Sequence, residues 1–198
     1  VPMGMTVTPQ RANAAGSAEL VVPSSLVSRE ARCALEMDGI LEAAAWTLSL
    51  RMPAEAVLSE PFVRLLHKRM FSRLYRRAGM LRQGAQETGT PPGEIMGSLR
   101  SLLQEGTCWI QEGDYDADET AVRIAHRLAR IRCFDLGNAR HARLFADVLL
   151  QQAFHAPPFT WGCRSPRPST QAARSRYLDA MNEADLGDFE PLLLLARS

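Results

Sequence analysis

Apolar residues recur every three or four positions along most of the chain, the spacing that places them on one side of an α-helix. A first helix is predicted from Ser28, a residue type suited to capping a helix N-terminus, to about Leu50. Pro53 follows closely, and the residue before a proline is biased away from helical geometry. A second helix is predicted to begin at Ser59, with Pro61 in its first turn.

The second half of the chain keeps this helical period. Apolar positions predict a helix over residues 95–110, and Asp116 is expected to cap the next helix, over residues 119–132. The helix over residues 139–153 is apolar on much of its circumference, which predicts the buried central helix of the fold. Two closing helices are expected, separated near Gly187.

One segment interrupts the helical pattern. Residues 79–93, GMLRQGAQETGTPPG, contain glycines and two adjacent prolines, which predict a loop or a short hairpin. No stretch alternates cleanly enough to be a central strand, so the predicted fold class is all-α. Residues 1–24 are small, polar and aperiodic, and we expect a flexible N-terminal arm before a single domain over residues 25–198.

Composition and charge narrow the classes of partner. The 198 residues are 46% hydrophobic and 23% charged, with a formal net charge of +1, as expected for a globular domain. This charge gives no argument for nucleic acid or membrane as a partner. No apolar run reaches about 18 residues, and the first residues lack the layout of a signal peptide. We therefore expect a cytoplasmic protein.

The cysteines and histidines are scattered along the chain. The four cysteines form no C-x-x-C pair, and the four histidines form no H-x-x-x-H pair on one helix. We expect reduced, structural thiols and no dedicated transition-metal site.

The stretch RIRCFDLGNARHARLFADVLL, residues 130–150, predicts a short turn that leads into the central helix. A helix N-terminus exposes unpaired N–H groups and carries partial positive charge. Gly137 allows close approach of a ligand, and Arg140 and Arg143 should lean back over the turn. Together these features predict a site for an anion, best suited to a polyphosphate. The alternative is a plain interhelical turn with two arginines in solvent.

The same residues resemble the motif of the Fic/Doc (Fido-domain) family, H-x-F-x-[DE]-G-N-G-R-x-x-R. The sequence RCFDLGNARHAR aligns with it without a gap, and Phe134, Gly137, Asn138, Arg140 and Arg143 match. Further stretches, among them FVRLLHKRMFSRLYRRAG and ADLGDFEPLLLLARS, resemble the small stand-alone subgroup called mobile mystery protein B. The resemblance covers the chain from about residue 25 to its C-terminus.

The resemblance implies a helical bundle around a buried central helix, and AMP transfer from ATP to a hydroxyl of a target protein. Asn138 and the main chain at Gly137 and Ala139 would hold phosphates, and Arg140 and Arg143 would contact the β and γ phosphates. Residues 79–93 would be the family's flap, a short β-hairpin that aligns the target by strand addition. The flap residues expected to contact the target are Leu81, Arg82, Gln83, Gly84 and Thr90.

Three positions depart from the motif. Arg132 stands where the family has its general-base histidine, and an arginine stays protonated near neutral pH. Leu136 replaces the acidic residue that binds magnesium, and Asp135 would be a weak substitute one position early. Ala139 replaces the second glycine. We therefore predict a pseudoenzyme that keeps a site for nucleotide phosphate and binds ATP weakly, with little dependence on Mg²⁺.

Two other functions stay open. One is a working transferase with an unorthodox base, for which His126 is a minor candidate, or with another phosphate-containing substrate. The other is an interaction module that binds a protein at the flap groove. A regulator protein encoded nearby, as in toxin–antitoxin pairs, is a possible further partner. The string SLLQEG, residues 101–106, matches the family's inhibitory motif, but it lies in the wrong place and is read as coincidence.

Overall fold

The computed structural model describes residues 20–21, 28–162 and 171–198. Most of the expected N-terminal arm therefore lies outside the described residues. Within it, Leu20 forms an isolated antiparallel bridge with Tyr75, and Val21 donates a backbone hydrogen bond to Leu74.

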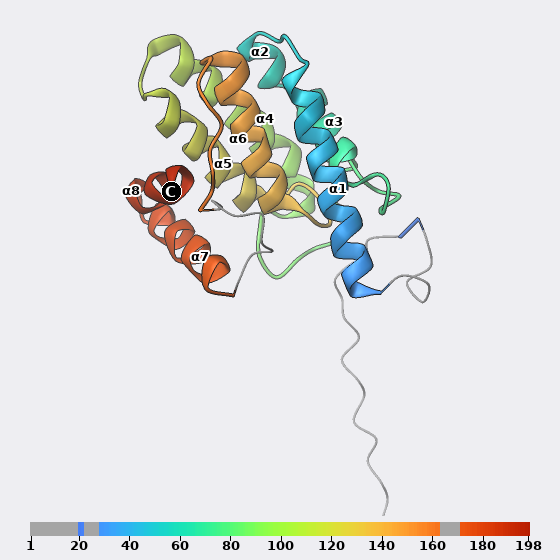
Figure 1. Ribbon diagram of the computed structural model, residues 1–198. Coiled ribbons are helices and arrows are strands. Elements are labelled where there is room, and N and C mark those ends of the chain that lie inside the picture. Colours follow the sequence, from blue (N-terminus) through green and yellow to red (C-terminus); the bar gives the residue numbers. More distant parts are fainter. Residues whose placement is uncertain (1–19, 22–27, 163–170) are drawn as a thin grey trace, which may run out of the picture.

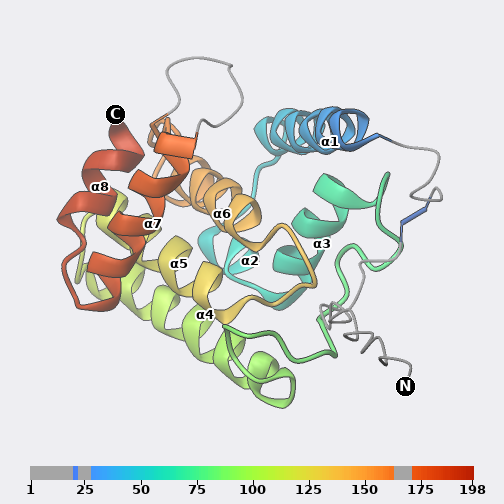
Figure 2. The ribbon, with the colours of Figure 1, turned by 90° about the horizontal axis from the view of Figure 1, so that it is seen from below.

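Helices are the only regular elements longer than an isolated bridge in the described part of the chain, so the all-α prediction is confirmed (Figures 1 and 2). The helices are α1 (Arg29–Leu48), α2 (Ala54–Val57), α3 (Glu60–Phe71), the short 3-10 helix η2 (Pro92–Glu94), α4 (Ile95–Glu112), α5 (Ala117–Ile131), α6 (Asn138–Ala153), α7 (Gln171–Asp185) and α8 (Glu190–Arg197). None of these described helices combines the length and the apolar character needed to cross a membrane.

The predicted caps are present. The side chains of Ser28, Ser59 and Asp116 accept hydrogen bonds from backbone N–H groups in the first turns of α1, α3 and α5. Several boundaries differ from the prediction by one or two residues: α1 ends at Leu48, α5 spans Ala117–Ile131 and α6 begins at Asn138. Helix α4 continues to Glu112, where Gly113 caps it in the left-handed conformation.

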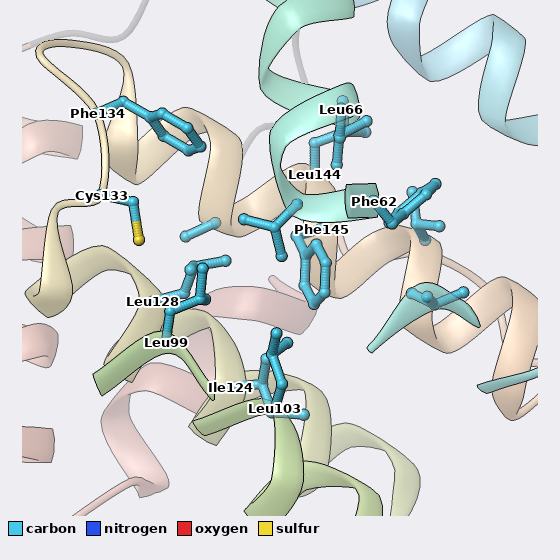
Figure 3. Packing of buried hydrophobic residues seen from close by; sticks show 14 of the residues in the cluster. Phe62, Leu66, Leu99, Leu103, Ile124, Leu128, Cys133, Phe134, Leu144 and Phe145 are labelled. Carbon is cyan, nitrogen blue, oxygen red and sulfur yellow. The ribbon is translucent and has the colours of Figure 1, made fainter. Parts of the chain in front are cut away.

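Helix α6 is the buried central helix, as its apolar circumference predicted. One side of α6 contributes Phe145, Val148 and Leu149 to a buried cluster that also holds residues of α3, α4 and α5. Figure 3 shows Phe145 within this cluster. Another side contributes Ala146 and Leu150 to a second cluster with α5, α7 and α8. Because α6 has apolar partners on both sides, its first turn is held firmly in place.

Helix α1 lies along α3 at the edge of the bundle (Figure 2). The two backbones approach closely at Gly39, where an added Cβ would come within 2.4 Å of the carbonyl oxygen of Met70. Trp46 stacks on Phe62, with 6.3 Å between the ring centroids. These contacts fix α1 beside α3, whose residues His67 and Phe71 contact the turn between α5 and α6.

The β-hairpin flap is not formed, and that part of the prediction is wrong. Residues 79–93 run as an irregular loop that ends in η2. The buried guanidinium of Arg82 donates to the carbonyl oxygens of Arg132, Gly84 and Thr90. Since a side chain satisfies these carbonyls, and Pro91 and Pro92 lack N–H groups, the segment has little need and little ability to pair with itself.

Candidate functional site at the start of helix α6

The turn between α5 and α6 begins and ends in left-handed geometry. Arg132, the C-cap of α5, has φ 55° and ψ 60°, and Gly137, the N-cap of α6, has φ 72°. For arginine this conformation costs free energy, which the surroundings must offset. The carbonyl of Arg132 accepts a 2.7 Å hydrogen bond from Nε of Arg82, so the loop over residues 79–93 helps to hold the turn.

The Asn138 side chain closes the turn. Its Oδ1 accepts from the backbone N–H of Phe134 at 2.9 Å, and its Nδ2 donates to the carbonyl of Phe134 at 2.8 Å. All of these groups are buried. Both ends of the amide are therefore used by the protein itself, and Asn138 acts on a ligand through the backbone that it positions.

His67, on α3, supports the turn from below. Its Nδ1 accepts a hydrogen bond from the backbone N–H of Gly79 at 3.0 Å, so Nε2 carries the proton and donates to the carbonyl of Leu136 at 3.0 Å. The ring stacks on Phe134 with 3.7 Å between centroids. Burial lowers the pKa of His67 to about 4, so it is neutral at physiological pH.

The other two buried histidines are held by different groups, and only His141 packs on the turn residue Phe134, with 5.1 Å between the ring centroids. His141 lies inside the core, where its Nε2 is 2.9 Å from the carbonyl of Val63, and burial lowers its pKa to about 3. His126 packs against Phe189, and its Nε2 lies 2.8 Å from the carboxylate of Asp185 at the end of α7.

Gly137 is required for a reason that the sequence did not reveal. A Cβ added there would lie 2.5 Å from the ring of Phe71, so the bare backbone packs directly on this ring. The glycine therefore serves packing as well as the positive φ of the turn.

Arg140 is bound by the protein in this conformation. Its guanidinium forms an ion pair with Glu36 of α1 and lies over the ring of Phe71, 5.2 Å from the centroid. Glu36 also accepts a hydrogen bond from the hydroxyl of Tyr75. Burial, aided by this hydrogen bond, raises the pKa of Tyr75 to about 12.

Arg143 is engaged by a different element. Its guanidinium lies over the ring of Tyr177 on α7, 5.1 Å from the centroid. One turn later, Asp147 accepts hydrogen bonds from the backbone of Phe159 and from the Trp161 indole, both at 3.1 Å. Burial raises the pKa of Asp147 to about 6, although Arg143 and both hydrogen bonds oppose the shift.

Arg132 turns its side chain toward the flap segment. The guanidinium donates to the hydroxyl of Thr88, and an added Cβ at Gly89 would come within 2.9 Å of Cδ of Arg132. Gln86, two residues before Thr88 in the same loop, donates to the carbonyl of Asp135 at 3.2 Å. The loop and the turn thus close on each other through the residue that stands at the motif's histidine position.

The side chains at the turn do not fit a magnesium ion. Leu136 offers no side-chain oxygen, and its carbonyl already accepts from His67. The carboxylate of Asp135 is paired with Arg77, at 3.0 Å between Oδ2 and Nε. Within the described residues, no three His, Cys, Asp or Glu side chains gather as a metal-binding group.

A wide groove of about 620 Å³ lies beside the flap segment. Gly97, Ser98 and Ser101 of α4 line it together with Gly89 and Thr90 of the loop. Thr90 is thus the residue of the expected target-contact set that lines this groove. Of the others, Arg82 is buried in its carbonyl contacts, Leu81 is partly buried, and Gln83 and Gly84 are exposed.

Helix α5 also lines the groove, through Arg127, Arg130 and Ile131. Arg127 is paired there with Glu105, and Arg130 with Asp185. Glu105, the acid of the SLLQEG string, is thus bound to α5 and to Ser101 rather than to a motif arginine.

The structure therefore defines an all-helical domain with a rigid glycine-containing turn at the start of its buried helix, bordered by arginines. Residues 57–150 match the model of the Fic/DOC family. This segment, which contains the turn and all of α3 to α5, is thereby assigned to the Fic/DOC family.

Solved structures agree on the fold. Fic-1 (aa134–508) from C. elegans is 21% identical with a TM-score of 0.64, over 89% of this chain and 50% of that chain. The N-terminal FIC domain of Bep8 from Bartonella sp. 1-1C is 14% identical with a TM-score of 0.66, over 85% and 84% of the two chains. BepC with bound AMPPNP from Bartonella tribocorum is 17% identical with a TM-score of 0.60, over 83% of each chain.

The present chain spans half the length of the C. elegans chain that it matches. No curated protein matches it in sequence.

Sequence reasoning missed several residues that shape this site. His67 lies 69 positions before its partner Leu136, and Glu36 lies 104 positions before Arg140. Local patterns give no signal for such pairs. The one available clue was that His67 interrupts the buried, apolar side of α3, where a polar residue needs a partner.

Proposed function

We propose that this chain is a Fic-domain protein in which AMP transfer is lost or severely reduced, while a site for a phosphate-bearing anion is kept at the start of α6. The observation that carries the proposal is Arg132 at the position of the motif histidine. A guanidinium stays protonated at neutral pH and cannot accept a proton from a target hydroxyl. Its hydrogen bond to Thr88 also gives it a structural role.

The three buried histidines offer no ready substitute. In His67 both ring nitrogens are bonded to backbone groups, and His141 is enclosed in the core. His126 lies beside Asp185 and Phe189, away from the turn. Loss of a general base alone slows a reaction by about 10²–10⁴-fold.

Support for the anion site comes from the first turn of α6. Its N–H groups, with Arg140 and Arg143 close by, suit phosphate oxygens. ATP would have to displace Glu36 from Arg140, and Ala139 adds a methyl group to the phosphate-facing backbone. We therefore propose weak ATP binding with little dependence on Mg²⁺, which calorimetric titration with and without the metal measures.

The transferase test uses labelled ATP and a cell extract. The wild-type protein should label nothing, whereas Arg132→His combined with Leu136→Asp and Ala139→Gly should restore labelling. In this combined variant, Arg143→Ala is the matched control and should abolish it. Robust labelling by the wild type that Arg143→Ala removes would instead establish a working transferase with another base.

The groove beside the flap segment favours a second candidate function, binding of a protein target without chemistry. Its hydroxyl-lined α4 wall and paired arginines suit a polar polypeptide segment. Arg143→Ala should then leave the affinity for the target unchanged. Gly97→Arg should lower this affinity, because the added side chain fills the groove. We also propose that the chain belongs to the mobile mystery protein B subgroup and is located in the cytoplasm. A regulator protein encoded nearby is a further proposed partner.

A further inference from the structure

The outward side of α1 carries an unusual stripe of apolar side chains. Met37, Leu41 and Leu48 are 50%, 60% and 62% exposed. With about 100° of rotation per residue, these three and the exposed Ala34 and Ala45 lie within about 40° of the direction of Leu41. We call these five residues the α1 stripe. It runs nearly the whole length of the helix.

The inward side of α1 is already occupied. Gly39, Ala43 and Trp46 face α3, and Glu36 reaches Arg140 from the same side. A surface helix that packs on one side normally carries polar residues on the other. A continuous exposed apolar row marks an interaction surface more often than a solvated one.

We propose that the α1 stripe binds the α1 stripe of a second copy of this chain, with the two helices antiparallel and Leu41 on the twofold axis. In this register Met37 lies opposite Ala45 of the second copy, and Ala34 lies opposite Leu48. Each large side chain thus meets a small one, apart from the leucine pair on the axis. A surface that complements itself in this way is what a twofold interface requires.

The charges at the two ends of the stripe favour the same pairing. Glu30 lies at the N-terminal end, in line with the stripe, and the exposed Arg51 follows its C-terminal end. Antiparallel helices keep the two copies of Glu30 apart and oppose the helix dipoles favourably, while Arg51 keeps its contacts to the carbonyls of Leu48 and Leu50. A parallel pair would place Glu30 against its own copy.

One helix pair buries less area than a standard stable interface, so we expect a dimer with a dissociation constant in the micromolar range. Analytical ultracentrifugation of the full chain from about 1 to 200 µM should show the shift from monomer to dimer. Leu41→Glu places two like charges on the axis and should leave only monomer. Leu194→Glu, at a 63% exposed leucine of α8, is the matched control and should still dimerise.

The orientation is tested by cross-linking. In a background with Cys33→Ser, Cys108→Ser and Cys163→Ser, an Ala34→Cys variant mixed with a Leu48→Cys variant should form a disulfide between copies under mild oxidation. A wild-type chain that stays monomeric throughout, or Leu41→Glu and Leu194→Glu that dimerise alike, overturns the proposal. So does a chain that dimerises only after residues 1–19 are removed, because that segment would then be the natural occupant of the stripe.

Discussion

The backbone of the motif turn and the arginines around it are held in different ways. Turn residues Phe134, Leu136 and Asn138 are fixed by buried or partly buried hydrogen bonds, and the turn packs on His67 and Phe71. Arg132, Arg140 and Arg143 are partly exposed and reach separate elements: the flap segment, α1 and α7.

This difference separates the motif residues that the fold requires from the motif residues that would take part in chemistry. Gly137 and Asn138 are required by the fold, since the first packs on Phe71 and the second closes the turn. Their match to the family motif therefore indicates a Fic fold whether or not chemistry occurs. The arginine side chains are partly exposed and each is held by contacts to a separate element, so a change in one of them disturbs the scaffold less than a change at Gly137 or Asn138.

The largest effect is expected from Asn138→Ala. Removing the amide leaves the buried N–H and carbonyl of Phe134 without partners, which should lower the free energy of unfolding by about 2–4 kcal/mol. Urea unfolding measures the loss. Asn182→Ala, which removes only an exposed contact to Arg130, is the control and should cost less than about 0.5 kcal/mol. Equal losses would show that Asn138 is no more important than a surface residue.

The second effect is a dependence of stability on pH. The pKa of His67 is about 4 in the folded chain and 6.5 when unperturbed. The neutral ring therefore contributes fully to the free energy of unfolding above pH 6.5, and this contribution is lost as the pH falls toward 4. Between pH 7 and pH 5 the loss from His67 should be about 2 kcal/mol. Urea unfolding across this range, compared with His67→Gln, isolates it, because the variant should lose less stability on acidification.

Asp147 provides a control of opposite sign. Its pKa is raised to about 6, so ionisation destabilises the folded chain, and this penalty is relieved as the pH falls. Asp147→Asn removes the relief, and the acid-induced loss of stability should become steeper than in the wild type. A shift of both variants in one direction would contradict the assignment of these two groups.

The smallest effect is expected at Arg140, where the substitution Glu36→Gln should strengthen ATP binding. Without the carboxylate, Arg140 can turn to a phosphate without breaking an ion pair, which should lower the dissociation constant by about 3–10-fold. Calorimetry detects this change. Glu42→Gln, on the same helix but paired with the exposed Arg73, should leave the affinity unchanged. No gain for Glu36→Gln would mean that Arg140 does not contact the phosphate.

Most of the fold was accessible from the sequence. Helix periods and caps are local, so Ser28, Ser59 and Asp116 could be placed from their neighbours alone. The prediction of a β-hairpin flap was wrong because contacts between distant residues decide the conformation of this segment. Residues 79–93 were expected to pair with themselves, but the Arg82 side chain satisfies their carbonyls and links them to Arg132, 50 positions away.

By itself, the sequence determined the helices, the central place of α6 and the absence of a histidine at residue 132, because these depend on residue type and short-range spacing. Only the tertiary structure decided that His67 fixes the turn, that Glu36 binds Arg140 and that Phe71 covers Gly137. These contacts join residues far apart in the chain. Which distant groups meet depends on how whole helices pack, and a local pattern carries no record of that choice.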